Sequence, residues 1–163
     1  MALFGESRDI SLIRTINKEL LERIIEQRIG YYKINLSKTT SNMYGESINK
    51  TYNDPILVTC LIDRGDDVMV AEESNITANK EITVRFLRDT LVELNLLPEI
   101  GDIILWDEKY FEVNQSNENQ YIVGKNPDYS YLSDTDNFGT SLSITVTANY
   151  VKPERFNLKQ QRL

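Results

Sequence analysis

Gly30 separates two hydrophobic periodicities in this chain. Before it, large aliphatic residues recur at steps of three or four: Ile10, Ile13, Ile16, Leu20 and Ile24. This spacing predicts an amphipathic helix over residues 9–29. After Gly30, apolar residues alternate with polar ones over short segments, which indicates strands. We therefore expect a mainly β fold with one long N-terminal helix, in the α+β class.

The predicted helix has recognisable ends and two different faces. Ser7 or Asp9 can cap its start, and Gly30 is the usual type of residue just beyond a helix end. The face opposite the aliphatic residues is charged and carries Arg14, Lys18, Glu22 and Glu26. We expect the apolar face to pack against the sheet, and the alternative is that part of it contacts another subunit.

The rest of the chain predicts short strands joined by turns and loops. The expected strands are residues 31–36, 56–63, 68–71, 80–87, 103–106, 110–114, 120–123 and 141–150. Residues 88–97 also fit a short helix, because Leu91, Leu94 and Leu97 recur at helical spacing. The turn at 107–109 predicts a compact hairpin. We expect a small antiparallel β-barrel or sandwich with long loops.

The length of 163 residues is that of one ordinary domain. We expect a single domain over 1–163, in which the helix occupies 1–30 and the β-barrel 31–151. Two polar arms, 37–55 and 124–139, interrupt the barrel without a regular period. A basic tail follows at 152–163. The arms and the tail are the segments that we expect to contact other subunits.

Charge is distributed unevenly along the chain, whose net charge is −7. Residues 1–40 carry seven basic and five acidic residues, residues 41–151 carry seven and nineteen, and residues 152–163 carry four and one. The acidic centre argues against a protein that coats nucleic acid, which needs a concentrated basic surface. Basic ends docking on acidic bodies of neighbouring copies would explain the pattern, although chance variation explains it as well.

The composition removes several classes of enzyme. No histidine is present, so Ser-His-Asp and Cys-His catalysis and ordinary zinc sites are excluded. The glycines are too scattered for a phosphate-binding loop. Asp134 to Gly139 begins like a calcium loop, but Phe138 and Thr145 occupy positions that need oxygen ligands. We expect no catalytic residue, cofactor or metal, and a carboxylate-based hydrolase is kept as a remote alternative.

The segments outside the helix and strands are rich in aromatic residues. We expect a subunit interface at five of them and at three basic residues of the tail: Tyr44, Tyr52, Tyr129, Tyr131, Phe138, Arg155, Lys159 and Arg162. The single cysteine, Cys60, lies in an apolar run and is expected to be a packed strand residue. No apolar run is long enough to cross a bilayer, so we expect a protein of the cytosol with no membrane contact.

Several segments together resemble the neck, or head-closure, proteins of contractile-tailed bacteriophages. The residues that carry the resemblance are 86–91, 96–106, 110–113, 118–120, 124–129 and 138–144, with the earlier loop 44–46. They span about residues 30–155. The Gly101-Asp102-Ile103-Ile104 hairpin alone is common in small barrels, and the ordered set is more specific.

This resemblance implies a structural virion protein at the head-tail junction, assembled in the host cytoplasm. It implies a ring of six or twelve copies that contacts portal or adaptor proteins on one side and tail proteins on the other. DNA would pass through the ring without specific recognition, and the ring would help to retain the genome. The alternatives are a tail-terminator or tail-completion ring, and a small-ligand-binding β-barrel.

Overall fold

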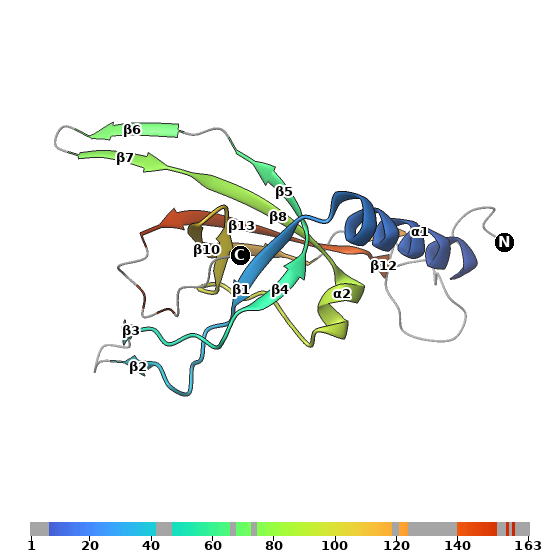
Figure 1. Cartoon of the computed structure of the whole chain (residues 1–163), viewed down its shortest axis with the longest axis horizontal. Coiled ribbons are helices and arrows are strands. Elements are labelled where there is room, and N and C mark those ends of the chain that lie inside the picture. Colours follow the sequence, from blue (N-terminus) through green and yellow to red (C-terminus); the bar gives the residue numbers. More distant parts are fainter. Residues whose placement is uncertain are drawn as a thin grey trace, which may run out of the picture.

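The computed structural model describes residues 7–41, 47–65, 68–72, 75–118, 121–123, 140–152, 156 and 158 (Figure 1). Three helical segments are present in this part of the chain: α1 (Ser7–Glu19), the π-helical segment η1 (Leu20–Ile25) and α2 (Arg88–Glu93). The first strands are β1 (Arg28–Tyr32), β2 (Thr40–Ser41), β3 (Ser47–Asn49), β4 (Ile56–Thr59), β5 (Leu61–Arg64), β6 (Val68–Glu72) and β7 (Asn75–Asn79). The remaining strands are β8 (Glu81–Leu87), β9 (Ile103–Trp106), β10 (Lys109–Asn117), β11 (Tyr121–Val123), β12 (Thr140–Ser141) and β13 (Ser143–Val151).

Seven strands form one antiparallel sheet in the order β4-β1-β9-β10-β13-β8-β5. The mainly β class with an N-terminal helix is therefore confirmed. The hairpin β9–β10 is also confirmed, and its turn consists of Asp107 and Glu108, both with a left-handed backbone (φ 48° and 59°). A two-residue turn of this kind matches the natural twist of the paired strands.

The expected closed barrel is not found in the described residues. The edge strands β4 and β5 do not pair with each other along their lengths, because they follow one another end to end with only Cys60 between them. Cys60 donates its backbone N–H to the carbonyl of Gln27 at 3.0 Å. One chain segment therefore pairs with β1 through its first half and with β8 through its second half, and the sheet remains open.

The end of the N-terminal helix was predicted wrongly. The helix stops at Ile25, and Glu26 adopts a left-handed backbone (φ 49°) whose N–H bonds the carbonyl of Leu21 at 3.0 Å. Gly30 lies in the middle of β1, where it is paired with Leu57 on one side and Leu105 on the other. A glycine after an apolar run resembles a helix stop, but here it occupies a buried strand position.

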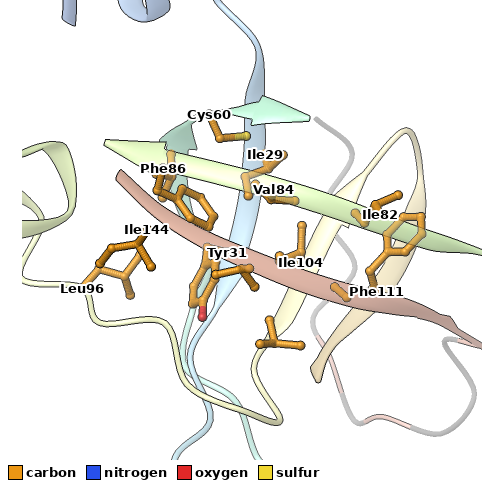
Figure 2. Packing of buried hydrophobic residues seen from close by; sticks show 14 of the residues in the cluster. Ile29, Tyr31, Cys60, Ile82, Val84, Phe86, Leu96, Ile104, Phe111 and Ile144 are labelled. Carbon is orange, nitrogen blue, oxygen red and sulfur yellow. The ribbon is translucent and has the colours of Figure 1, made fainter. Parts of the chain in front are cut away.

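The main core lies on one face of the sheet, where apolar residues from most of its strands meet (Figure 2). Its largest fully buried members include Ile29, Tyr31, Phe86, Ile104 and Phe111. The predicted alternation in 80–87 and 141–150 is confirmed, because Ile82, Val84 and Phe86 in β8 and Ile144, Val146 and Ala148 in β13 are all buried. These side chains fill the space that the curved sheet encloses.

A smaller cluster covers the opposite face of β1, β9 and β10. Tyr32, Ile103, Leu105 and Tyr110 form it, and Tyr52, Phe156 and Leu158 pack against them. Phe156 and Leu158 of the predicted basic tail therefore pack on their own chain. The predicted arm 37–55 contains the short hairpin β2–β3, whereas the arm 124–139 lies outside the described residues.

One further hairpin, β6–β7, continues from β5 and β8 and projects beyond the sheet (Figure 1). Its backbone register runs from Val68 opposite Asn79 to Glu72 opposite Asn75. The strand predicted at 68–71 is therefore confirmed, and its partner is the strand 75–79. Helix α2 follows β8 directly, which resolves the ambiguous segment 88–97 as a single short helix with an irregular continuation.

Candidate subunit interface

Helix α1 rests on α2 through its charged face. Lys18 Nζ lies 2.6 Å from Glu93 Oε1 and 4.0 Å from Glu22 Oε1, and Arg14 Nε lies 3.7 Å from Asp89 Oδ2. The hydrogen bond to Glu93 raises the pKa of Lys18. Arg14, Lys18 and Glu22 are spaced four residues apart and so share one face of the helix. The charged face of α1 is thus the side turned towards the body.

The aliphatic face of α1 and η1 is exposed as a consequence. Ile16 and Leu20 each lie two positions from Lys18, which is about 200° around a helix and therefore on its other side. We define the α1 stripe as the five large aliphatic residues Leu12, Ile13, Ile16, Leu20 and Ile24, which are 40 to 73% exposed. The expectation that this face packs on the sheet is wrong, because ion pairs and not apolar contacts hold the helix to α2.

A stripe of this size is unusual on the surface of a lone soluble chain. Isolated exposed aliphatic residues are common, but five on one face of a helix form an apolar patch, and large patches of this kind are typical of interaction surfaces. In the same helix only Ile10 is buried among the described residues of α1, and η1 has no buried residue. The stripe is therefore the strongest candidate for a binding surface in the described part of the chain.

A second surface with exposed leucines lies between β4 and α2. It is a shallow groove of about 510 Å³, and η1 forms one of its sides. We call it the β4–α2 groove, and its lining combines Leu57 and Leu94 with polar and charged residues: Glu22, Arg23, Arg28, Thr59, Thr90 and Glu93. Leu57 is 54% exposed and Leu94 is 37% exposed. The groove follows an edge strand of the sheet, where strands commonly accept an additional partner.

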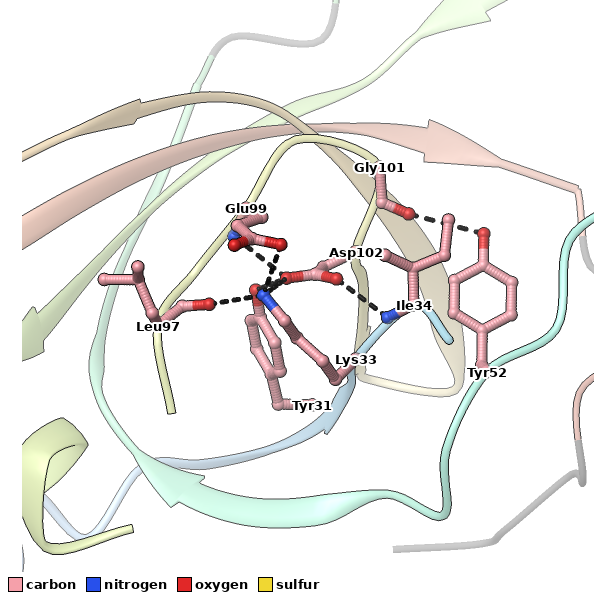
Figure 3. A network of polar contacts seen from close by, with 8 residues as sticks. All are labelled: Tyr31, Lys33, Ile34, Tyr52, Leu97, Glu99, Gly101 and Asp102. Atoms are coloured by element: carbon pink, nitrogen blue, oxygen red, sulfur yellow. Dashed lines mark hydrogen bonds and ion pairs between the residues drawn. The ribbon is translucent and has the colours of Figure 1, made fainter. Parts of the chain in front are cut away.

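Asp102 fixes the chain that runs from α2 into the sheet (Figure 3). Its side chain is fully buried and accepts four hydrogen bonds. The donors are the Tyr31 hydroxyl at 2.6 Å, Lys33 Nζ at 3.2 Å, and the backbone N–H groups of Ile34 and Glu99, both at 2.9 Å. A buried carboxylate with this many donors is well compensated for the loss of water.

Lys33 extends the network to the turn after α2. Its Nζ donates to the carbonyl of Leu97 at 2.6 Å and lies 2.9 Å from Glu99 Oε2. Burial, with Asp102 beside the ring, raises the pKa of Tyr31 far above its usual value near 10, so its hydroxyl remains a donor. The network joins β1 to the 97–102 turn and thereby holds the segment that carries Leu94 and Leu97.

Of the eight interface residues expected from sequence, the structure describes Tyr52. Its ring is half-buried and packs edge-on against Phe156 with 5.8 Å between ring centres. Its hydroxyl donates to the carbonyl of Gly101 at 3.3 Å. Burial, and secondarily the charges of Glu112 and Asp102, raise the pKa of Tyr52. The other seven lie outside the described residues: Tyr44, Tyr129, Tyr131, Phe138, Arg155, Lys159 and Arg162.

Two further features of the described residues concern metal binding and membranes. No group of three or more His, Cys, Asp or Glu side chains is placed to hold a metal ion in this part of the chain. No helix among the same residues is long and apolar enough to span a membrane. Cys60 is buried as expected, and burial raises the pKa of its thiol to about 12.

Sequence reasoning missed two features of this region. The stripe was recognised as an apolar helical face but was assigned mainly to the core. The buried role of Asp102 was not predicted, and the one local sign of it is that this lone Asp directly precedes the apolar run Ile103-Ile104-Leu105. The helical spacing does not show which surface covers the apolar face, and the position of Asp102 does not show which donors surround its carboxylate.

Comparison with known proteins yields a likeness of fold. No protein-family model matches the chain, and no curated protein matches it significantly. Among solved structures, the chain is similar to one from a structure described as "Virion of native gene transfer agent (GTA) particle", with a TM-score of 0.50 and 10% sequence identity. The match covers 77% of this chain and 94% of that chain. At this identity, what the two proteins are shown to share is the fold.

Proposed function

We propose that this protein is a structural component of a phage-like virion that forms a ring in the neck, between the portal side and the tail. The observation that carries the proposal is the exposed α1 stripe, because a chain that leaves five large aliphatic residues in water is built to be covered by a partner. The fold likeness to a virion chain supports the class of particle.

Assembly, and not catalysis, is the activity that fits the described residues. The charged residues of α1, α2 and the 97–102 turn pair with one another. Asp102 is fully buried and accepts four hydrogen bonds from the chain itself, which fits a structural role. The ring would have six or twelve copies and would contact portal or adaptor proteins on one side and tail proteins on the other.

The acidic centre of the chain suits a channel through which DNA passes. Residues 41–151 carry twelve more acidic than basic residues. Like charges repel, so a DNA backbone gains no strong attachment to such a wall and can slide along it. In this proposal the ring helps to retain the genome by closing the head mechanically, and no base is recognised.

Cryo-electron microscopy of particles from cells with and without the gene tests the proposal. We expect density for this fold between the portal and the tail, and we expect particles that lack the protein to have DNA-filled or leaking heads without tails. Density at the upper end of the tail, together with tails of irregular length, would identify a tail-terminator ring. Absence of the protein from purified particles would contradict a virion role altogether.

A further inference from the structure

The α1 stripe and the β4–α2 groove differ in form and composition. The α1 stripe lies on the side of the helix turned away from α2, whereas the β4–α2 groove lies on the body, between β4, η1 and α2. An isologous contact uses one self-complementary surface, while a ring requires two different surfaces on each copy. The stripe and the groove are two such surfaces, one a ridge of aliphatic side chains and the other a hollow.

We propose that the α1 stripe of each copy packs into the β4–α2 groove of the next copy. The inference rests on the proposed assembly of this chain into a ring and deepens it by naming the contact. In this arrangement Ile16 and Leu20 cover Leu57 and Leu94, all of which are exposed in the single chain. Both surfaces lose water together, which is the main source of favourable free energy in such a contact.

One charged residue on each surface can pair with the other. The groove is also lined by Glu22, Arg23 and Glu93, each of which lies in an ion pair with Lys18 or Glu19. Arg28 lines the groove, is exposed, and belongs to none of the ion pairs among the described residues. Glu19 lies at the edge of the stripe with 60% of its side chain exposed, held only by a 3.7 Å pair with the more exposed Arg23. When the stripe of one copy enters the groove of the next, Glu19 can pair with Arg28, which favours a second copy as the occupant.

A closed ring engages both surfaces of every copy. In a closed ring every copy uses its stripe and its groove at once, so each copy is held by two contacts and leaves only when both break.

Two single substitutions and their mixture test this arrangement. Ile16→Glu destroys the stripe but keeps the groove, and Leu57→Glu destroys the groove but keeps the stripe. We expect each variant alone to be monomeric by native mass spectrometry and light scattering, with the contact weakened at least about 100-fold because a charge must enter an apolar interface. We expect the 1:1 mixture to form a heterodimer and nothing larger, since it contains one intact stripe-groove pair.

Matched controls separate loss of the contact from loss of the fold. Leu36→Glu places the same charge on a residue that is 72% exposed and outside both surfaces, so it is expected to assemble like the wild type. Circular dichroism and thermal unfolding of each variant must match the wild type. Should Leu57→Glu fold poorly, Leu94→Glu replaces it, because Leu94 lines the same groove from α2.

Three results would overturn the inference. A wild-type chain that stays monomeric, stripe and groove variants that keep the wild-type assembly, or a mixture that remains monomeric would each do so. If the Ile16→Glu variant alone is monomeric while Leu57→Glu assembles normally, the stripes pair with each other instead. A virion role is decided separately by the presence of the protein in particles, so it survives any of these outcomes.

Discussion

The sheet and the N-terminal helix both contain isoleucines, but the sheet buries them and the helix exposes them. Ile29, Ile82 and Ile104 are fully buried in the sheet, whereas Ile16 and Ile24 on the helix are 54% and 73% exposed. The sheet is held by apolar packing around one buried acid, and the helix is held by ion pairs at its surface. Folding of the single chain is therefore concentrated in the sheet, while the helix leaves a large apolar surface exposed.

The largest expected effect is on the sheet side of this comparison. Asp102→Ala leaves the Tyr31 hydroxyl, Lys33 and two backbone N–H groups without their acceptor in a buried site. We expect the free energy of unfolding to fall by about 3–5 kcal/mol in urea titrations followed by Trp106 fluorescence. Asp102→Asn keeps the shape and one acceptor and should lose less. A fall below about 1 kcal/mol for Asp102→Ala would show that the network is not a main support of the sheet.

The second prediction compares the reactivity of a thiol in the sheet with that of a thiol on the helix. The pKa of Cys60 is raised from 9.0 to about 12 by burial, whereas a cysteine placed at the exposed position of Leu20 should titrate normally. Near pH 8, three units of pKa correspond to about a 1,000-fold smaller thiolate fraction. We expect Leu20→Cys to react at least that much faster than Cys60 with a maleimide in the folded monomer. Equal rates would mean that the junction between β4 and β5 opens readily.

The same substitution at two isoleucines compares the regions directly. Ile104→Ala removes fully buried side-chain atoms and should lower the free energy of unfolding by about 2–5 kcal/mol. Ile16→Ala should change it by no more than about 0.5 kcal/mol when the chain is monomeric, because Ile16 already contacts water. Chemical unfolding at low protein concentration measures both. Comparable losses would place the stripe in the core of the single chain.

Alkaline pH should act on the sheet through Tyr31, with the smallest effect. The pKa of Tyr31 lies well above 10 in the folded chain, because burial and Asp102 disfavour the phenolate, and returns to about 10 on unfolding. The unfolded state then releases a proton that the folded state keeps, so the contribution of Tyr31 to stability is constant below pH 10 and falls above it. One such group contributes about 1.4 kcal/mol per pH unit. Tyr31→Phe should make the fall shallower in unfolding curves between pH 9 and 11, and an unchanged slope would contradict this assignment.

Strands with strict alternation could be predicted from the sequence, because every second residue of a half-buried strand is apolar. This held for β8 and β13, and the Asp107-Glu108 turn identified the hairpin β9–β10. Closure of the barrel was predicted wrongly, since the pattern of residues 56–63 is the same whether the strand has one partner or changes partner at Cys60.

The position of the helix could not be predicted for a related reason. A helical pattern of aliphatic residues indicates that the helix has an apolar face, but not which way that face points. In this chain the ion pairs that turn the face outward depend on Asp89 and Glu93, more than seventy residues away in the sequence. The four donors around Asp102 also come from distant segments, except for Glu99. Contacts of this kind are properties of the fold and leave no local signature.

The passage of one strand from β1 to β8 at Cys60 couples the two margins of the sheet mechanically. Any force that peels β4 away from β1 is transmitted through a single residue to β5, whose pairing with β8 must then yield or resist. A load applied along this segment is therefore shared between two sets of backbone hydrogen bonds that meet at Cys60.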